Sequence, residues 1–271
     1  MKRFAGAIVL MLVLAPIAAH AQSLWLPRDR GSITLEALKP NFKTIDEDFF
    51  TGAFFLDLRT PIKEGGWIVA EVPYARVSAD YFEVFFGLTH FSEASLGNLY
   101  LGIETGGGRY FGEFGVRFPT TPSGNDLIAA QTGASSDFGR FNTFYPKLFS
   151  AQGVFNLRLV SPGGISNRGR LGGALAAYTA GGDPELFGIY SWQTGYEGRA
   201  VRVGVGASGT VWLTRGAVTG GSIFTNQLEA HADFGAGRIR PGLEAKLPLG
   251  DPADVVSVVL GASLSVGLGS E

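Results

Sequence analysis

The residues that could carry out chemistry are few, and they do not form a recognisable catalytic or metal-binding motif. The chain has three histidines and no cysteine in 271 residues, which excludes disulfides and thiolate metal centres. His90 lies two residues before Ser92, but this spacing matches no catalytic motif. No nucleophile elbow, zinc-protease motif or phosphate-binding loop occurs in the sequence. We therefore expect no enzymatic activity, no metal and no cofactor.

Most charged residues instead alternate with apolar ones. Between residues 201 and 214, one set of alternate positions is apolar, and the other, which begins at Arg202, is small or polar. Residues 224–234, 238–249 and 149–159 repeat this pattern. A period of two predicts β-strands with one apolar and one polar face. These segments exceed the ~5–6 residues of a typical strand and reach the ~9–11 that a tilted membrane-spanning strand needs.

The composition favours the same fold. The chain contains 40 glycines, only 17% charged residues and 12% aromatic residues. Disorder is excluded because the chain is apolar and its net charge is only −2. With no basic run, the sequence is not that of a nucleic-acid-binding protein. A soluble β fold would also show alternation, but it would not need such long strands with one face so free of charge.

The N-terminus has the features of an export signal. Lys2 and Arg3 precede an apolar stretch over residues 4–19, and Ala19-His20-Ala21 fits the cleavage rule. We predict a signal peptide over residues 1–21 and a mature barrel over residues 22–271. No later segment reaches the ~20 apolar residues of a membrane helix, because the best candidate, residues 255–268, carries serines at alternate positions. The predicted location is the bacterial outer membrane.

The predicted fold is all-β, an antiparallel up-and-down transmembrane barrel of about 12 strands with both termini in the periplasm. Its longest outer loops are residues 75–96 and 119–147. Short turns alternate with these longer connections, as is usual for such barrels. The predicted strands are residues 31–38, 50–58, 66–74, 97–105, 109–118, 148–160, 169–179, 187–197, 201–214, 223–235, 238–249 and 255–268.

The polar faces would place nine acids, seven bases and one histidine in the lumen. They are Glu36, Asp57, Arg59, Glu71, Glu104, Glu113, Arg117, Arg158, Glu197, Arg202, Glu229, His231, Asp233, Arg238, Arg240, Glu244 and Lys246. Tight turns at 198–200 and 235–237 predict a charge ladder at the periplasmic end, formed by Glu197, Arg202, Asp233 and Arg240. Such a ladder is either a selectivity or gating belt, or a structural neutralisation of buried charge.

Two stretches carry a resemblance to a known family. One is residues 96–103, with Gly97-Asn98-Leu99-Tyr100-Leu101-Gly102, and the other is residues 115–124, which end in Pro-Thr-Thr-Pro-Ser-Gly. They resemble the outer-membrane β-barrel family named as meta-pathway of phenol degradation proteins, as does the closing strand 260–268. Asn98 stands where that family more often has Asp, and its Pro-Thr-Gly is expanded here. The resemblance implies an outer-membrane barrel that passes hydrophobic or aromatic compounds.

Two functions follow as hypotheses. The first is a narrow passive channel for small hydrophobic or aromatic solutes, and the second is a non-conducting structural or binding barrel that uses its outer loops. The longest loop carries Phe138, Phe141, Phe144 and Tyr145. If these face inward they form a constriction and a solute-contact surface, and if they face outward the loop is a docking loop. The expected partners are outer-membrane lipid, a small hydrophobic solute and the barrel-assembly machinery, which would use an internal signal because the chain ends without an aromatic residue.

Overall fold

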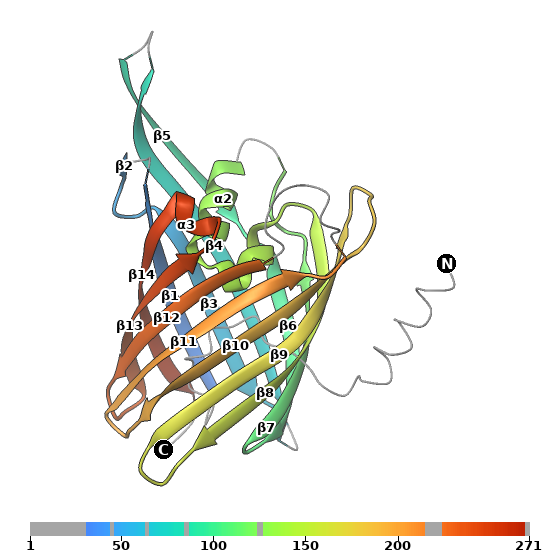
Figure 1. Ribbon diagram of the computed structural model, residues 1–271, viewed down its shortest axis with the longest axis vertical. Helices are drawn as coiled ribbons and strands as arrows, with labels where there is room; N and C mark the ends of the chain where they lie inside the picture. Colours follow the sequence, from blue (N-terminus) through green and yellow to red (C-terminus); the bar gives the residue numbers. More distant parts are fainter. Residues whose placement is uncertain are drawn as a thin grey trace.

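Twelve antiparallel strands close into a barrel (Figure 1). The computed structural model describes residues 31–43, 46–62, 65–83, 87–123, 127–214 and 224–268, so the predicted signal peptide lies outside it and stays a prediction. The barrel strands are β1 (Gly31–Phe42), β3 (Gly52–Pro61), β4 (Trp67–Glu83), β6 (Leu99–Gly107), β7 (Tyr110–Phe118), β8 (Leu148–Val160), β9 (Ile165–Tyr178), β10 (Glu185–Glu197), β11 (Val201–Trp212), β12 (Phe224–Phe234), β13 (Ile239–Leu249) and β14 (Val256–Leu268). The seams close where β1 pairs with β14 and β4 pairs with β6. The predicted fold class is confirmed.

The barrel wall is apolar outside and polar inside. Large apolar side chains point outward, such as Leu243, which is 60% exposed, and Leu260, which is 58% exposed. Glu36, Glu71 and Arg117 on the inward positions are buried. This arrangement suits a lipid surround and would be unfavourable in water, so the alternative of a soluble β fold is wrong. Among the described residues, no helix is long and apolar enough to cross a membrane.

The two ends of the barrel differ in their connections. At one end, here called the short-turn end, strands are joined by brief turns such as 161–164 and 198–200, and β1 begins beside the end of β14. The other end, here called the long-connection end, carries β2 (Asp46–Glu47), α3 (Pro252–Val255) and all the longer connections. The assignment of the short-turn end and the termini to the periplasm remains a prediction.

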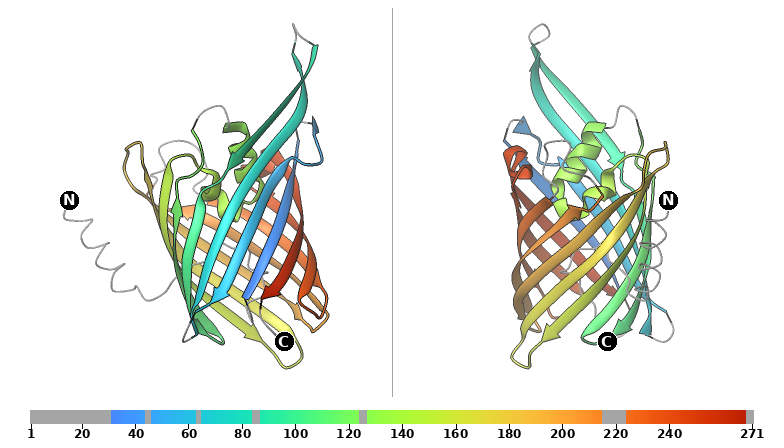
Figure 2. Two further views of the ribbon diagram at one scale, coloured as in Figure 1. Left: turned by 180° about the vertical axis from the view of Figure 1, so that it is seen from behind. Right: turned by 45° about the vertical axis from the view of Figure 1, so that its right-hand side comes forward.

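The predicted outer loop 75–96 is a β-hairpin. β4 continues to Glu83 and returns as β5 (Gly87–Leu96), and the two strands pair throughout. The hairpin projects beyond the rim of the barrel at the long-connection end (Figure 2). In this part of β4, Val77 and Ala79 are buried and Arg76 and Asp80 are exposed, but Ser78, on the same face as Arg76 and Asp80, is buried as well.

The predicted outer loop 119–147 folds back into the lumen. It contains α2 (Leu127–Ser136) and the 3₁₀ helix η2 (Phe138–Phe144), which lie within the barrel rim (Figure 2). α2 packs on β1, β3, β4 and β5, whereas η2 packs on β11 and β12. We call residues 127–144 the plug.

Leu243→Arg should impair folding far more than Glu244→Gln, because the two neighbours face lipid and lumen respectively. An arginine near the bilayer midplane costs ~2–4 kcal/mol, whereas Gln keeps the shape of Glu244 and one oxygen that can accept from Lys246, whose Nζ lies 3.2 Å from Glu244 Oε2. Urea titrations of refolding into lipid vesicles, followed by the heat-modifiable gel mobility of the folded barrel, measure both. Equal losses would mean that residue 243 does not face lipid.

Candidate functional site

A single arginine ties the plug to the acidic part of the barrel wall. The Arg140 guanidinium donates to Glu36 Oε2 at 2.7 Å and to Glu71 Oε2 at 3.2 Å, and to Asp137 Oδ2 at 2.9 Å. It also stacks 3.6 Å above the Phe55 ring centroid. Planar guanidinium groups suit this combination of several carboxylates and an aromatic face.

A carboxylate of the plug makes the complementary contact with β12 and β13. Asp137 accepts hydrogen bonds from Lys246 Nζ at 2.8 Å and from Gln227 Nε2 at 2.9 Å. Burial alone would raise the pKa of Asp137, but Lys246 and Arg140 hold it below its ordinary value. Phe138 N also donates to Gln227 Oε1 at 3.1 Å. We call Asp137 and Arg140, with the wall groups they bind, the latch.

The aromatic residues of loop 119–147 lie in different places. Phe144 is buried and meets Phe55 edge to face, with ring centroids 5.9 Å apart. Phe138 packs against the same apolar cluster, and Tyr145 packs against a second one. The side chain of Phe141 lies outside the described part of the structure. The loop therefore takes the inward arrangement, with Phe144 forming part of the plug's own packing.

The motif behind the family resemblance anchors loop 119–147 near both of its ends. Asn98 is buried, and its Nδ2 donates to the carbonyl oxygens of Asn142 at 3.1 Å and Tyr145 at 2.8 Å. Its Oδ1 accepts from Thr121 N at 3.1 Å. The neighbouring Thr120 hydroxyl donates to Gly97 O at 2.6 Å. An amide both donates and accepts, whereas a carboxylate could not donate to the two carbonyls, which explains why Asn occupies this position.

The structure brings the predicted charge ladder together at the short-turn end. Glu197 lies opposite Arg202, and Arg202 lies opposite Asp233, as the turns predicted. Arg240 is close enough to Asp233 for the two opposite charges to attract each other. The ion pairs of Glu197, however, are with two other arginines, Arg158 and Arg168.

Two further arginines complete this group. Arg158 Nη2 donates to Glu197 at 2.6 Å, and Arg168 Nε donates to it at 3.1 Å. Arg168 was absent from the predicted lumen set because the strand was expected to begin at 169, but β9 begins at Ile165. Arg238, predicted inside, is exposed in the turn before β13. We call Arg158, Arg168, Arg202 and Arg240, with Glu197 and Asp233, the basic belt.

The cavities beside the plug are too small for an organic solute. One of about 40 Å³ lies between Arg140, Tyr190 and Lys246. Others of about 20 Å³ and about 10 Å³ lie beside Asn142 and beside the basic belt. A cavity that binds benzene measures about 150 Å³. None of these three cavities can therefore hold an organic solute in the described arrangement.

A serine, a histidine and an aspartate meet on the projecting hairpin. His90 Nδ1 lies 2.8 Å from Asp80 Oδ1, and its Nε2 lies 3.4 Å from Ser78 Oγ. The Ser78 hydroxyl nevertheless donates to Asp48 Oδ2 at 2.6 Å, and Ser78 is only 2% exposed. A nucleophilic serine must be able to give its hydroxyl proton to the histidine, and its oxygen must be accessible to substrate. Ser78 meets neither condition, so the cluster fits a structural role. Ser92, the partner considered from sequence, lies opposite Ser78 in the hairpin.

Comparison with solved structures places the fold among outer-membrane barrels. An outer-membrane channel from Pseudomonas putida F1 aligns with a TM-score of 0.61 and 10% identity, covering 94% of this chain and 98% of that one. The NanC porin aligns with a TM-score of 0.52 and 8% identity, covering 87% and 100%. LpxR from Salmonella typhimurium aligns with a TM-score of 0.52 and 9% identity, covering 88% of this chain and 100% of that one. No protein-family model and no curated protein matches the sequence. The predicted outer-membrane barrel is confirmed, and the phenol-degradation family is not.

Proposed function

We propose that this outer-membrane barrel is a channel for small solutes that its own plug holds closed. The observation that carries the proposal is the latch, in which Asp137 and Arg140 of one inward-folded connection bind separate strands of the lumen wall. The likeness to proteins described as an outer-membrane channel and as a porin supports a transport role for this fold.

A latch made of ion pairs suits a closure that can be released. When an apolar contact opens to water, the whole free energy gained by burying its surface is lost. When an ion pair opens, water solvates the two separated charges and offsets much of the lost attraction. Glu36, Glu71 and Lys246 would then line an aqueous passage. The contacts of Asn98 and Thr120 hold loop 119–147 to the rim on either side of the plug, so that the plug can leave the lumen and return.

The proposed solutes are small hydrophobic or aromatic compounds. Apolar side chains line the lumen near the long-connection end in two clusters, one around Phe55 and Phe144 and the other around Phe187 and Trp212. Apolar surfaces with a few polar groups are what such ligands need. Phe138, Phe141, Phe144 and Tyr145 remain the proposed solute-contact residues, and they would meet solute only when the plug moves.

The second candidate is a non-conducting barrel that binds a partner through its outer side. The projecting β4–β5 hairpin favours this function because it offers two strands beyond the rim (Figure 2). The packed lumen is compatible with it as well.

Deletion of the plug separates the two functions. We expect low conductance from the refolded protein in planar bilayers, and a large increase when residues 127–144 are replaced by a short Gly-Ser linker. Uptake of a small aromatic compound by cells should rise in parallel. The heat-modifiable gel shift confirms that the variant is folded. A folded variant that neither conducts nor increases uptake would favour the binding barrel.

A further inference from the structure

We infer, on the basis of the proposed channel function, that the solutes are small organic carboxylates and that the basic belt is the site that recognises them. The belt combines four arginines with two carboxylates at one level of the lumen, the short-turn end. The solute class is thereby narrowed from aromatic compounds in general to their anions.

The charge balance of this level is positive. Arg168 lies near Arg158 and Arg202 as well as Glu197, so like charges are held together here. Asp233 lies near Arg168, Arg202 and Arg240. On the facing part of the wall, Arg59 and Glu104 pair at 2.5 Å and cancel each other. Among the described residues of the belt, four guanidinium groups stand against two carboxylates, and this excess of positive charge would attract an anion.

The belt already holds one carboxylate, which shows that its geometry suits this group. Glu197 accepts from Arg158 through one oxygen and from Arg168 through the other. Guanidinium groups bind carboxylates through such paired, charge-assisted hydrogen bonds. Arg202, which lies directly opposite Glu197 across the β10–β11 pair, carries the same type of donor group.

A neutral polar side chain provides an independent indication of a ligand. Gln193 is 1% exposed and lines the small cavity between Arg168 and Arg202. Within the described residues, neither its amide nitrogen nor its amide oxygen has a hydrogen-bond partner. A buried amide without partners is costly. The cavity beside it measures about 10 Å³ in the described arrangement, so the amide N–H groups would donate to a solute carboxylate only when the passage is open.

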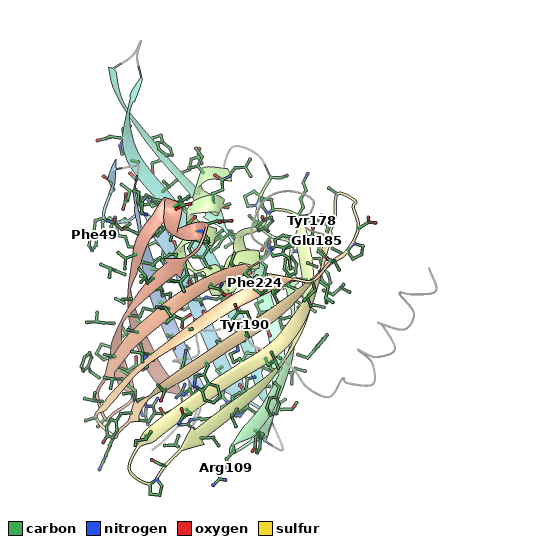
Figure 3. All side chains as sticks on the ribbon, in the orientation of Figure 1. Phe49, Arg109, Tyr178, Glu185, Tyr190 and Phe224 are labelled. Atoms are coloured by element: carbon green, nitrogen blue, oxygen red, sulfur yellow. The ribbon has the colours of Figure 1, made fainter. Side chains whose placement is uncertain are left out.

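The charge of the whole barrel is asymmetric along its axis. The described turns of the short-turn end carry Arg109, Arg199 and Arg238 and no acidic residue. Apart from residues 127–144, the described connections of the opposite end carry Asp46, Glu47, Asp48, Asp183, Asp251 and Asp254 against Lys43 and Lys147. Figure 3 shows Arg109 at the basic end, and Glu185 and Tyr178 at the other. Charges on exposed loops are screened within about 10 Å by salt, so the buried belt should set the selectivity.

The test uses benzoate and benzamide, which have the same shape and differ in charge. In planar bilayers with a potassium benzoate gradient, we expect the reversal potential of the full-length protein to show preference for benzoate over potassium. In liposome-swelling assays, benzoate should enter faster than benzamide. Arg168→Gln and Arg202→Gln should each lower the benzoate preference about tenfold, a typical effect of one lost charge contact.

Matched variants separate selectivity from folding. Arg202→Lys keeps the charge and should keep most of the preference, and Arg238→Gln removes an exposed arginine from the neighbouring turn and should change nothing. A channel that conducts but prefers potassium, or whose preference survives both Arg168→Gln and Arg202→Gln, would overturn this inference alone. A barrel that stays silent even after replacement of residues 127–144 would overturn the channel function, and the inference with it.

Discussion

A disulfide between positions 139 and 208 is expected to abolish solute flux, and its reduction to restore it. Gly139 lies in η2 of the plug, and a Cβ built on it would lie 3.3 Å from the Ser208 side-chain oxygen on β11. The Sγ atom of a cysteine at position 208 would take about the place of this oxygen, within reach of an S–S bond of about 2 Å to a cysteine at position 139. The chain has no cysteine, so Gly139→Cys with Ser208→Cys can form only this intramolecular bond.

Conductance of the double variant before and after dithiothreitol gives the measurement. We expect full block in the oxidised protein and a return to at least the wild-type level on reduction, since Ser208 also bonds Gln227 and its loss weakens the latch. Each single cysteine variant is a control and should not respond to reductant. Flux through the oxidised double variant at the wild-type level would show that solute does not need the plug to move.

The barrel itself could be predicted from the sequence because lipid and lumen impose a strict period of two. Leu243 must face out and Glu244 in, and a shift of one residue would reverse every side chain. The same regularity, together with tight turns, predicts that Glu197, Arg202 and Asp233 lie side by side, as they do across β10, β11 and β12.

The latch could not be predicted in this way because Asp137 and Arg140 lie in a connection with no period. Their partners Glu36, Glu71 and Lys246 lie up to 109 positions away along the chain, and only the inward fold brings them together. The aromatic residues of that loop suggested a contact surface, but the pattern gave no sign that Phe144 would pack against Phe55. The inward-facing apolar clusters were missed for a related reason, since polar-in alternation fails where the plug replaces water.

Arg140→Gln is expected to open the channel. The substitution removes the cation that binds Glu36, Glu71 and Asp137 and leaves these buried carboxylates without it, which typically costs about 3–5 kcal/mol. The barrel strands lose few contacts of their own, so most of this cost falls on the docked plug. A latch weakened by about 3 kcal/mol shifts the closed-to-open ratio by roughly two orders of magnitude.

Single-channel recordings should therefore show a large rise in open probability for Arg140→Gln, while the urea midpoint of barrel unfolding falls less. Arg140→Lys keeps the charge but not the forked geometry, and we expect an intermediate effect. Arg76→Gln, which changes an exposed arginine on the hairpin, controls for the loss of one positive charge and should conduct like the wild type. If Arg140→Gln lowers barrel stability as much as it weakens closure, Arg140 holds the whole barrel together and the latch is not a separate element. If neither property changes, the plug is held by its apolar packing around Phe144, and charge pairs in the lumen serve only to neutralise one another.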